Sequence, residues 1–101
     1  MVGLFNLGPF IQLPQPPFYV NPYTWAAHAN LLFVDNPAGV GFSYLEREED
    51  LYNNDMSVSQ DLYAVFKQFY TYWPELLSNP LYLGGNSYGG AYAPYLAWQM
   101  H

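Results

Sequence analysis

Apolar and polar residues are distributed along the chain in a pattern that predicts two buried strands and two helices. An apolar run over 29–34 ends at Asp35-Asn36-Pro37, and a second run over 81–84 leads into glycine, as in strands that are buried on both faces. Between them, apolar side chains recur every three or four positions over 57–73, which predicts a helix with one broad apolar face. The members of this face are Leu62, Val65, Phe66, Phe69, Tyr70 and Trp73.

The limits of this first helix are marked by residues with distinct backbone preferences. Ser57 with Gln60 fits a capping box at its start, and Asp55 or Asp61 would favour its N-terminus electrostatically. Pro74 ends it, because proline cannot continue the helical hydrogen bonding.

The order of the predicted elements indicates an α/β protein. A second helix is predicted over 90–100, and Pro94 inside it should kink it because proline has no N–H to bond back one turn. Strand, helix, strand and helix then form a βαβα unit with parallel strands covered on both faces. With 101 residues, the chain is at most one domain. Near the N-terminus, a cluster of prolines excludes helix and predicts a loop with extended pieces: Pro9, Pro14, Pro16, Pro17 and Pro22.

The junction between the second strand and the second helix carries the clearest chemical signal. Residues 81–90 read Leu-Tyr-Leu-Gly-Gly-Asn-Ser-Tyr-Gly-Gly, an apolar run followed by Gly-x-Ser-x-Gly. This order is typical of a nucleophile elbow, in which a strained turn exposes the hydroxyl of Ser87. We expect glycine at 85 and 89 because a Cβ at either position would collide with the neighbouring strand or helix.

Charge and composition exclude several classes of function. Arg47 and Lys67 are the only strong cations against eight carboxylates, and the net charge is −6. Binding to nucleic acid or to an anionic membrane surface needs clustered Lys and Arg, so neither is expected. The sequence contains no cysteine, which excludes disulfides and thiolate metal sites within it, and no apolar run long enough to span a membrane.

Several blocks of the sequence resemble the serine carboxypeptidase family of α/β-hydrolase fold. They are residues 3–9, with Gly-Leu-Phe and Leu-Gly-Pro, residues 21–25, residues 29–44 and residues 82–94. The resemblance covers nearly all of the chain but a minor part of a typical family member. It therefore implies that residues 1–101 are a fragment of a single α/β-hydrolase domain.

The resemblance implies the roles of two residues at the elbow. Ser87 would be the catalytic nucleophile, and the backbone N–H of Tyr88 would donate to the oxyanion. Such an enzyme releases single residues from peptide C-termini through an acyl-enzyme, needs no metal or organic cofactor, and works in the lysosome, in the vacuole or outside the cell. The family's Gly-Gly-Pro-Gly segment, catalytic Asp and catalytic His have no counterpart in residues 1–101, so we expect the isolated segment to be inactive.

Two departures from the family pattern concern substrate binding. Asn6 and Asn86 stand where the family usually has a pair of glutamates that share a proton and bind the substrate's C-terminal carboxylate. An Asn amide can donate a hydrogen bond to a carboxylate without needing protonation, so both residues are candidates for the same role. Alternatively, both positions have drifted in a lineage that no longer binds a free C-terminus.

The two histidines are poor candidates for the general base. His28 comes before the serine, opposite to the Ser, Asp, His order of this fold, and His101 lies at the far end of the helix that follows Ser87. Two alternatives to a carboxypeptidase remain open. One is an esterase or carboxypeptidase-like acyltransferase on the same scaffold, and the other is a non-catalytic pseudoenzyme remnant.

Overall fold

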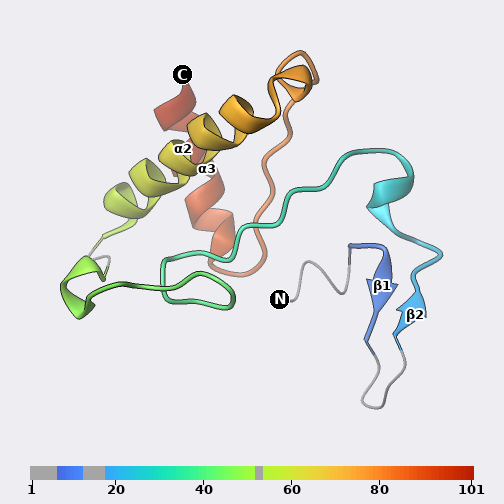
Figure 1. Ribbon diagram of the computed structural model, residues 1–101, viewed down its shortest axis with the longest axis horizontal. Helices are drawn as coiled ribbons and strands as arrows, with labels where there is room; N and C mark the ends of the chain where they lie inside the picture. The colour runs from blue at the N-terminus through green and yellow to red at the C-terminus, as the bar shows by residue number, and fades with distance from the viewer. Residues whose placement is uncertain (1–6, 13–17, 52–53) are drawn as a thin grey trace. The chain divides into compact units, whose positions relative to one another are not determined.

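The computed structural model describes residues 7–12, 18–51 and 54–101 and divides the chain into two units, residues 1–35 and 36–101. In the first unit, strand β1 (Phe10–Ile11) pairs with strand β2 (Tyr19–Val20) in an antiparallel hairpin (Figure 1). Phe10 lies opposite Val20, and Ile11 lies opposite Tyr19. This hairpin falls in the proline-rich segment, where a loop with extended pieces was predicted.

Asn21 holds the first unit together. Its buried side chain donates to the carbonyl of Gly8 at 2.9 Å and accepts from the N–H of Tyr23 at 3.0 Å. Leu7 accepts twice, from the Thr24 hydroxyl at 3.1 Å and from the Trp25 N–H at 3.0 Å. A 3-10 turn, Trp25–Ala27, follows. Two blocks that the sequence singled out, around 7–9 and 21–25, are therefore joined by direct hydrogen bonds.

In the second unit, helix α2 (Asp55–Tyr72) begins slightly earlier than the sequence predicts. The capping box of Ser57 with Gln60 is wrong: the N-cap is Asn54, whose side-chain oxygen accepts from the Ser57 N–H at 2.9 Å. Ser57 completes the same turn by donating its hydroxyl to the Asn54 carbonyl at 2.9 Å. Asn is as good an N-cap as Ser, and its earlier position moves the cap back by three residues, slightly less than one turn. Pro74 starts a 3-10 turn (Pro74–Leu76) directly after the helix, as expected for a terminator.

Helix α3 (Gly89–Met100) continues through Pro94 and packs against α2 (Figure 1). The core between them consists of five buried apolar side chains: Val58, Leu62, Phe66, Tyr92 and Leu96. Ser59 is also fully buried, and its hydroxyl donates to the carbonyl of Met56 at 2.8 Å. These contacts hold α2 against α3, the helix that directly follows the predicted elbow.

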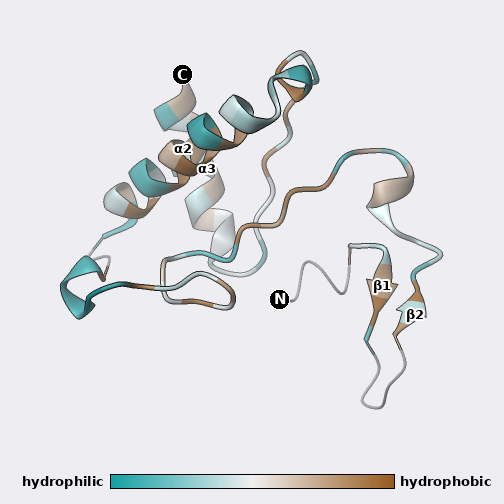
Figure 2. Cartoon of the chain, viewed as in Figure 1, coloured by the Kyte–Doolittle hydropathy of each residue, from teal (hydrophilic) through white to brown (hydrophobic). Residues whose placement is uncertain are grey.

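The apolar face of α2 is narrower than the sequence predicts. Leu62 and Phe66 are buried, but Val65 is 43% exposed and Trp73 is 47% exposed. Figure 2 shows hydrophilic and hydrophobic residues alternating along this helix. One helix covers only one stripe of its neighbour, so α3 buries the side of α2 that carries Val58, Leu62 and Phe66 and leaves the flank open.

The two predicted parallel strands are not formed in this structure. Residues 30–36 and 81–85 have no regular secondary structure, and within the described residues the only sheet is the antiparallel pair β1 and β2. A strand requires a neighbour for its backbone hydrogen bonds, and no described segment provides that ladder for either run. The apolar residues that predicted these strands do not pair with a neighbouring strand within the described residues.

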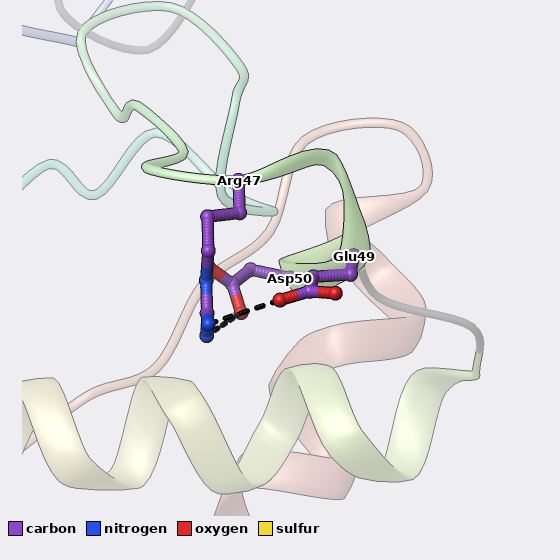
Figure 3. Close-up of polar contacts among 3 residues, drawn as sticks. All are labelled: Arg47, Glu49 and Asp50. Atoms are coloured by element: carbon purple, nitrogen blue, oxygen red, sulfur yellow. Dashed lines mark hydrogen bonds and ion pairs between the residues drawn. The ribbon is translucent and has the colours of Figure 1, made fainter.

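The connection from Asn36 to Asn54 turns sharply and then becomes acidic. Gly39 and Gly41 have φ angles of +88° and +60°, which glycine adopts without strain, and two turns close through Val40 and Ser43. Beyond them, Arg47 bridges two carboxylates, at 2.9 Å to Glu49 and 3.1 Å to Asp50 (Figure 3). All three side chains are exposed, between 40% and 70%, so this cluster lies in a solvated loop. No described helix is both long and apolar enough to cross a membrane.

Candidate active site

Ser87 has the backbone conformation that a nucleophile elbow requires. Its φ is +55°, and no other residue besides glycine has a positive φ in the described part of the chain. A residue with a Cβ pays a steric cost in this left-handed region, so surrounding structure must hold it there. The side chain is exposed. The strained turn predicted from Gly-x-Ser-x-Gly is therefore confirmed in its geometry.

Three consecutive hydrogen bonds carry the chain from this turn into α3. The N–H of Gly89 donates to the Asn86 carbonyl at 2.9 Å, that of Gly90 to the Ser87 carbonyl at 3.0 Å, and that of Ala91 to the Tyr88 carbonyl at 2.9 Å. Each bond spans three residues, which makes the entry into the helix tighter than an α-helical turn. Ser87 thus lies immediately before the first turn of a helix that is packed in the core of its unit.

Only one of the two flanking glycines is required by close packing. A Cβ on Gly85 would overlap the carbonyl of Gly89 and lie 2.6 Å from the nitrogen of Gly90, so the first glycine is needed as predicted. The prediction for Gly89 is wrong: a Cβ there meets nothing within 4 Å. The crowding arises where the incoming chain passes under the start of α3, and Gly85, not Gly89, occupies that position.

Tyr88 is held by two side chains of the second unit. Its hydroxyl donates to the Asp55 carboxylate, with the oxygens 3.1 Å and 3.3 Å away, and its ring packs edge-on against Tyr92 at 5.2 Å. The sequence pattern predicts only that Asp55 or Asp61 favours the start of a helix electrostatically. Nothing in the local pattern links it to Tyr88, because the contact spans 33 residues.

The other candidate residues lie at different places in the chain, and one of them is outside the described residues. Asn86 is exposed beside Ser87, whereas Asn6 lies outside the described residues. His28 is exposed at the end of the 3-10 turn in the first unit, and His101 follows the last residue of α3. Since α3 has 12 residues, about 18 Å of helix separates Ser87 from His101, too far for a direct hydrogen bond.

Acidic and histidine side chains do not gather into a metal site in this part of the chain. Within residues 7–12, 18–51 and 54–101, no three His, Asp or Glu side chains lie together in a way that could hold an ion. The groups at the elbow that could act on a substrate are the Ser87 hydroxyl, the backbone N–H groups at the start of α3, and the side-chain amide of Asn86.

Comparison with known proteins identifies the family. The model of the serine carboxypeptidase family matches residues 1–101. The chain belongs to the serine carboxypeptidase family. The resemblance noted in the sequence is thereby confirmed, and with it membership of a family of α/β hydrolases that act as peptidases.

Individual relatives agree with the family match. The chain is 41% identical to the venom serine carboxypeptidase of Apis mellifera over 95 residues, which is 93% of this chain and 20% of that protein. It is 42% identical to the lysosomal protective protein of Mus musculus over 92 residues, 89% of this chain and 19% of that protein. It is 36% identical to the probable serine carboxypeptidase CPVL of Mus musculus over an alignment of 102 positions, which covers 100% of this chain and 21% of that protein. The chain thus spans about a fifth of the length of the curated relatives that it matches.

Proposed function

We propose that this chain supplies the nucleophile of a serine-type carboxypeptidase, and that the nucleophile is Ser87. The observation that carries the proposal is the left-handed backbone of Ser87 at the entry to α3, with Gly85 in close contact beneath it. A strained serine at the start of a packed helix presents its hydroxyl outward in a fixed direction. Membership of the serine carboxypeptidase family supports the same role.

In the proposed reaction, the Ser87 hydroxyl oxygen attacks the carbonyl carbon of the last peptide bond of the substrate. A histidine from outside residues 1–101 accepts the hydroxyl proton, and the Tyr88 N–H donates to the oxyanion of the tetrahedral intermediate. Collapse of this intermediate breaks the C–N bond and leaves an acyl group on Ser87, while the histidine gives its proton to the leaving amino acid. Water then hydrolyses the ester and restores the serine.

Recognition of the substrate's free carboxylate is assigned to Asn6 and Asn86. The exposed position of Asn86 directly before the nucleophile supports this, because the carboxylate of a C-terminal residue lies only a few bonds from the scissile carbonyl. An amide N–H can donate to that carboxylate at any pH at which the substrate is ionised. Peptide and protein C-termini are therefore the proposed substrates, with no nucleic acid or membrane partner.

The proposed fold and location follow from the same family. We propose that the apolar runs 29–34 and 81–84 are parallel strands of an α/β-hydrolase sheet, so that strand, α2, strand and α3 form a βαβα unit. The mainly apolar composition of both runs supports this, since strands covered on both faces are rich in apolar residues. Relatives named for venom and for the lysosome support action in the lysosome, in the vacuole or outside the cell.

The test compares Ser87→Ala with Ser78→Ala in the protein expressed from its complete coding sequence. Ser78 is an exposed serine on the turn after α2, so it is a matched control. We expect Ser87→Ala to lower the release of C-terminal residues from peptides by at least about a thousandfold, and Ser78→Ala to leave it unchanged. Undiminished hydrolysis by Ser87→Ala would refute the proposal. Hydrolysis of esters without hydrolysis of peptides would favour the esterase or acyltransferase alternative.

A further inference from the structure

We propose that Asp55 is a positioning residue for this site: its carboxylate holds the side chain of Tyr88 and thereby fixes the backbone of the elbow. The inference rests on the proposed roles of Ser87 and Tyr88. It adds a residue from the start of α2, distant in sequence from the elbow, to the machinery that acts on the substrate.

The contact itself is direct. The Tyr88 hydroxyl lies 3.1 Å from one oxygen of the Asp55 carboxylate and 3.3 Å from the other, across 33 residues of sequence. At 3.1 Å the bond is longer than a short charge-assisted hydrogen bond, so it restrains Tyr88 with moderate strength. Tyr88 also immediately precedes α3, so the bond ties the start of α3 to the start of α2.

Asp55 is a firm anchor because the first turn of α2 is itself held on several sides. The Asn54 side chain caps this turn, and Val58 is only 1% exposed in the core. The next residue, Met56, accepts a hydrogen bond on its sulfur from the side-chain amide of Gln99 at 3.2 Å. The first turn of α2 therefore contacts α3 at two places: Asp55 bonds to Tyr88 at the start of α3, and Met56 bonds to Gln99 near its end. A group carried by such a turn has little freedom to move.

The second restraint on Tyr88 acts on its ring. The ring packs edge-on against Tyr92, with centroids 5.2 Å apart and an interplanar angle of 68°. Tyr92 is buried in the helix core. The Tyr88 side chain is therefore held at its ring by α3 and at its hydroxyl by α2, which restricts rotation about its side-chain bonds.

Restraining Tyr88 restrains the proposed oxyanion donor. The Tyr88 N–H shares a planar peptide group with the Ser87 carbonyl, so the position of Tyr88 and the backbone of Ser87 are coupled. A donor that keeps its direction during the reaction stabilises developing charge without reorganising. Loss of the Asp55 contact should therefore lower kcat and leave KM nearly unchanged. The Tyr88 side chain is 61% exposed, so water competes for the bond and the effect should be moderate.

The experiment measures kcat and KM for five variants of the protein expressed from its complete coding sequence. We expect Tyr88→Phe and Asp55→Ala each to lower kcat by about fivefold to tenfold, and the double variant to lower it no further, because both remove one interaction. Asp55→Asn keeps a carbonyl acceptor and should recover most of the activity. Asp61→Ala removes an exposed carboxylate of the same helix and should leave kcat unchanged.

Multiplicative losses in the double variant, or an unchanged kcat in Tyr88→Phe, would overturn the inference. Amide hydrogen exchange of residues 86–90 provides a readout that does not depend on activity. Faster exchange in both Tyr88→Phe and Asp55→Ala supports the tether, and unchanged exchange contradicts it. If the wild-type protein hydrolyses no substrate while exchange responds to both variants, the proposed function fails and the tether stands.

Discussion

At the residue scale, the amide side chains proposed to bind the substrate carboxylate determine how binding should respond to pH. A carboxylic acid that binds a carboxylate must stay protonated, so its contribution is lost as pH rises. Asn6 and Asn86 have no titrating proton. We therefore expect KM for a peptide with a free C-terminus to stay nearly flat from mildly acidic to neutral pH, with the remaining pH dependence in kcat. Steady-state kinetics across this range measure the two separately.

Glutamate at both positions provides the control. Asn6→Glu with Asn86→Glu should introduce a rise in KM toward neutral pH. A wild-type KM that climbs tenfold, which corresponds to about 1.4 kcal/mol of binding free energy, would contradict the assignment if the double variant behaves the same.

The glycines of the elbow allow a matched pair of substitutions. Gly85→Ala should lower the free energy of unfolding by roughly 2–4 kcal/mol and disturb the site, because its Cβ would overlap the backbone of Gly89. Gly89→Ala should be neutral or slightly stabilising, since a Cβ there meets nothing and alanine favours a helix. Chemical denaturation of both variants, in the protein expressed from its complete coding sequence, measures the difference. Equal destabilisation by the two substitutions would contradict the packing described for Gly85.

At the element scale, the start of α2 depends on Asn54. Asn54→Ala removes the side-chain oxygen that accepts from the Ser57 N–H, so it should cost about 1 kcal/mol of stability. Gln60→Ala tests the capping box suggested by the sequence. It should lower the stability very little, because Gln60 is exposed and does not cap the helix. Thermal unfolding of the two variants, in the protein expressed from its complete coding sequence, compares their stabilities. A larger loss from Gln60→Ala would mean that the helix starts later than described.

The helices were more predictable than the strands for a physical reason. Helical hydrogen bonds are local, so the periodic apolar positions and Pro74 predicted α2 to within a few residues at both ends. The cap was missed because Asn54 and Ser57 are both competent caps, and local sequence does not choose between them. The runs at 29–34 and 81–84 need partners from elsewhere, so their apolar character alone does not form a sheet.

The site shows the same division between local and distant causes. The strained backbone of Ser87 was predictable because Gly-x-Ser-x-Gly between an apolar run and a helix encodes it locally. The contact of Asp55 with Tyr88 was not, because it exists only once α2 and α3 pack together. A pattern along the sequence carries no information about which side chains of two helices meet.

At the scale of the whole molecule, many large apolar side chains of the described residues are exposed, and few are buried. Tyr82 is 89% exposed, Phe42 and Tyr44 are each 78% exposed, and the described core contains five apolar residues. We expect the isolated segment to be poorly soluble or partly unfolded, because such exposed surfaces drive association. Calorimetry and light scattering of the purified segment test this. A cooperative thermal transition of a monomer would contradict it.

Covalent labelling shows whether Ser87 is the nucleophile. The protein expressed from its complete coding sequence is treated with a fluorophosphonate probe, digested, and mapped by mass spectrometry. We expect one modified peptide, with the phosphonyl group on the oxygen of Ser87, and no label in Ser87→Ala. A label on another residue, or labelling that persists in Ser87→Ala, would contradict it.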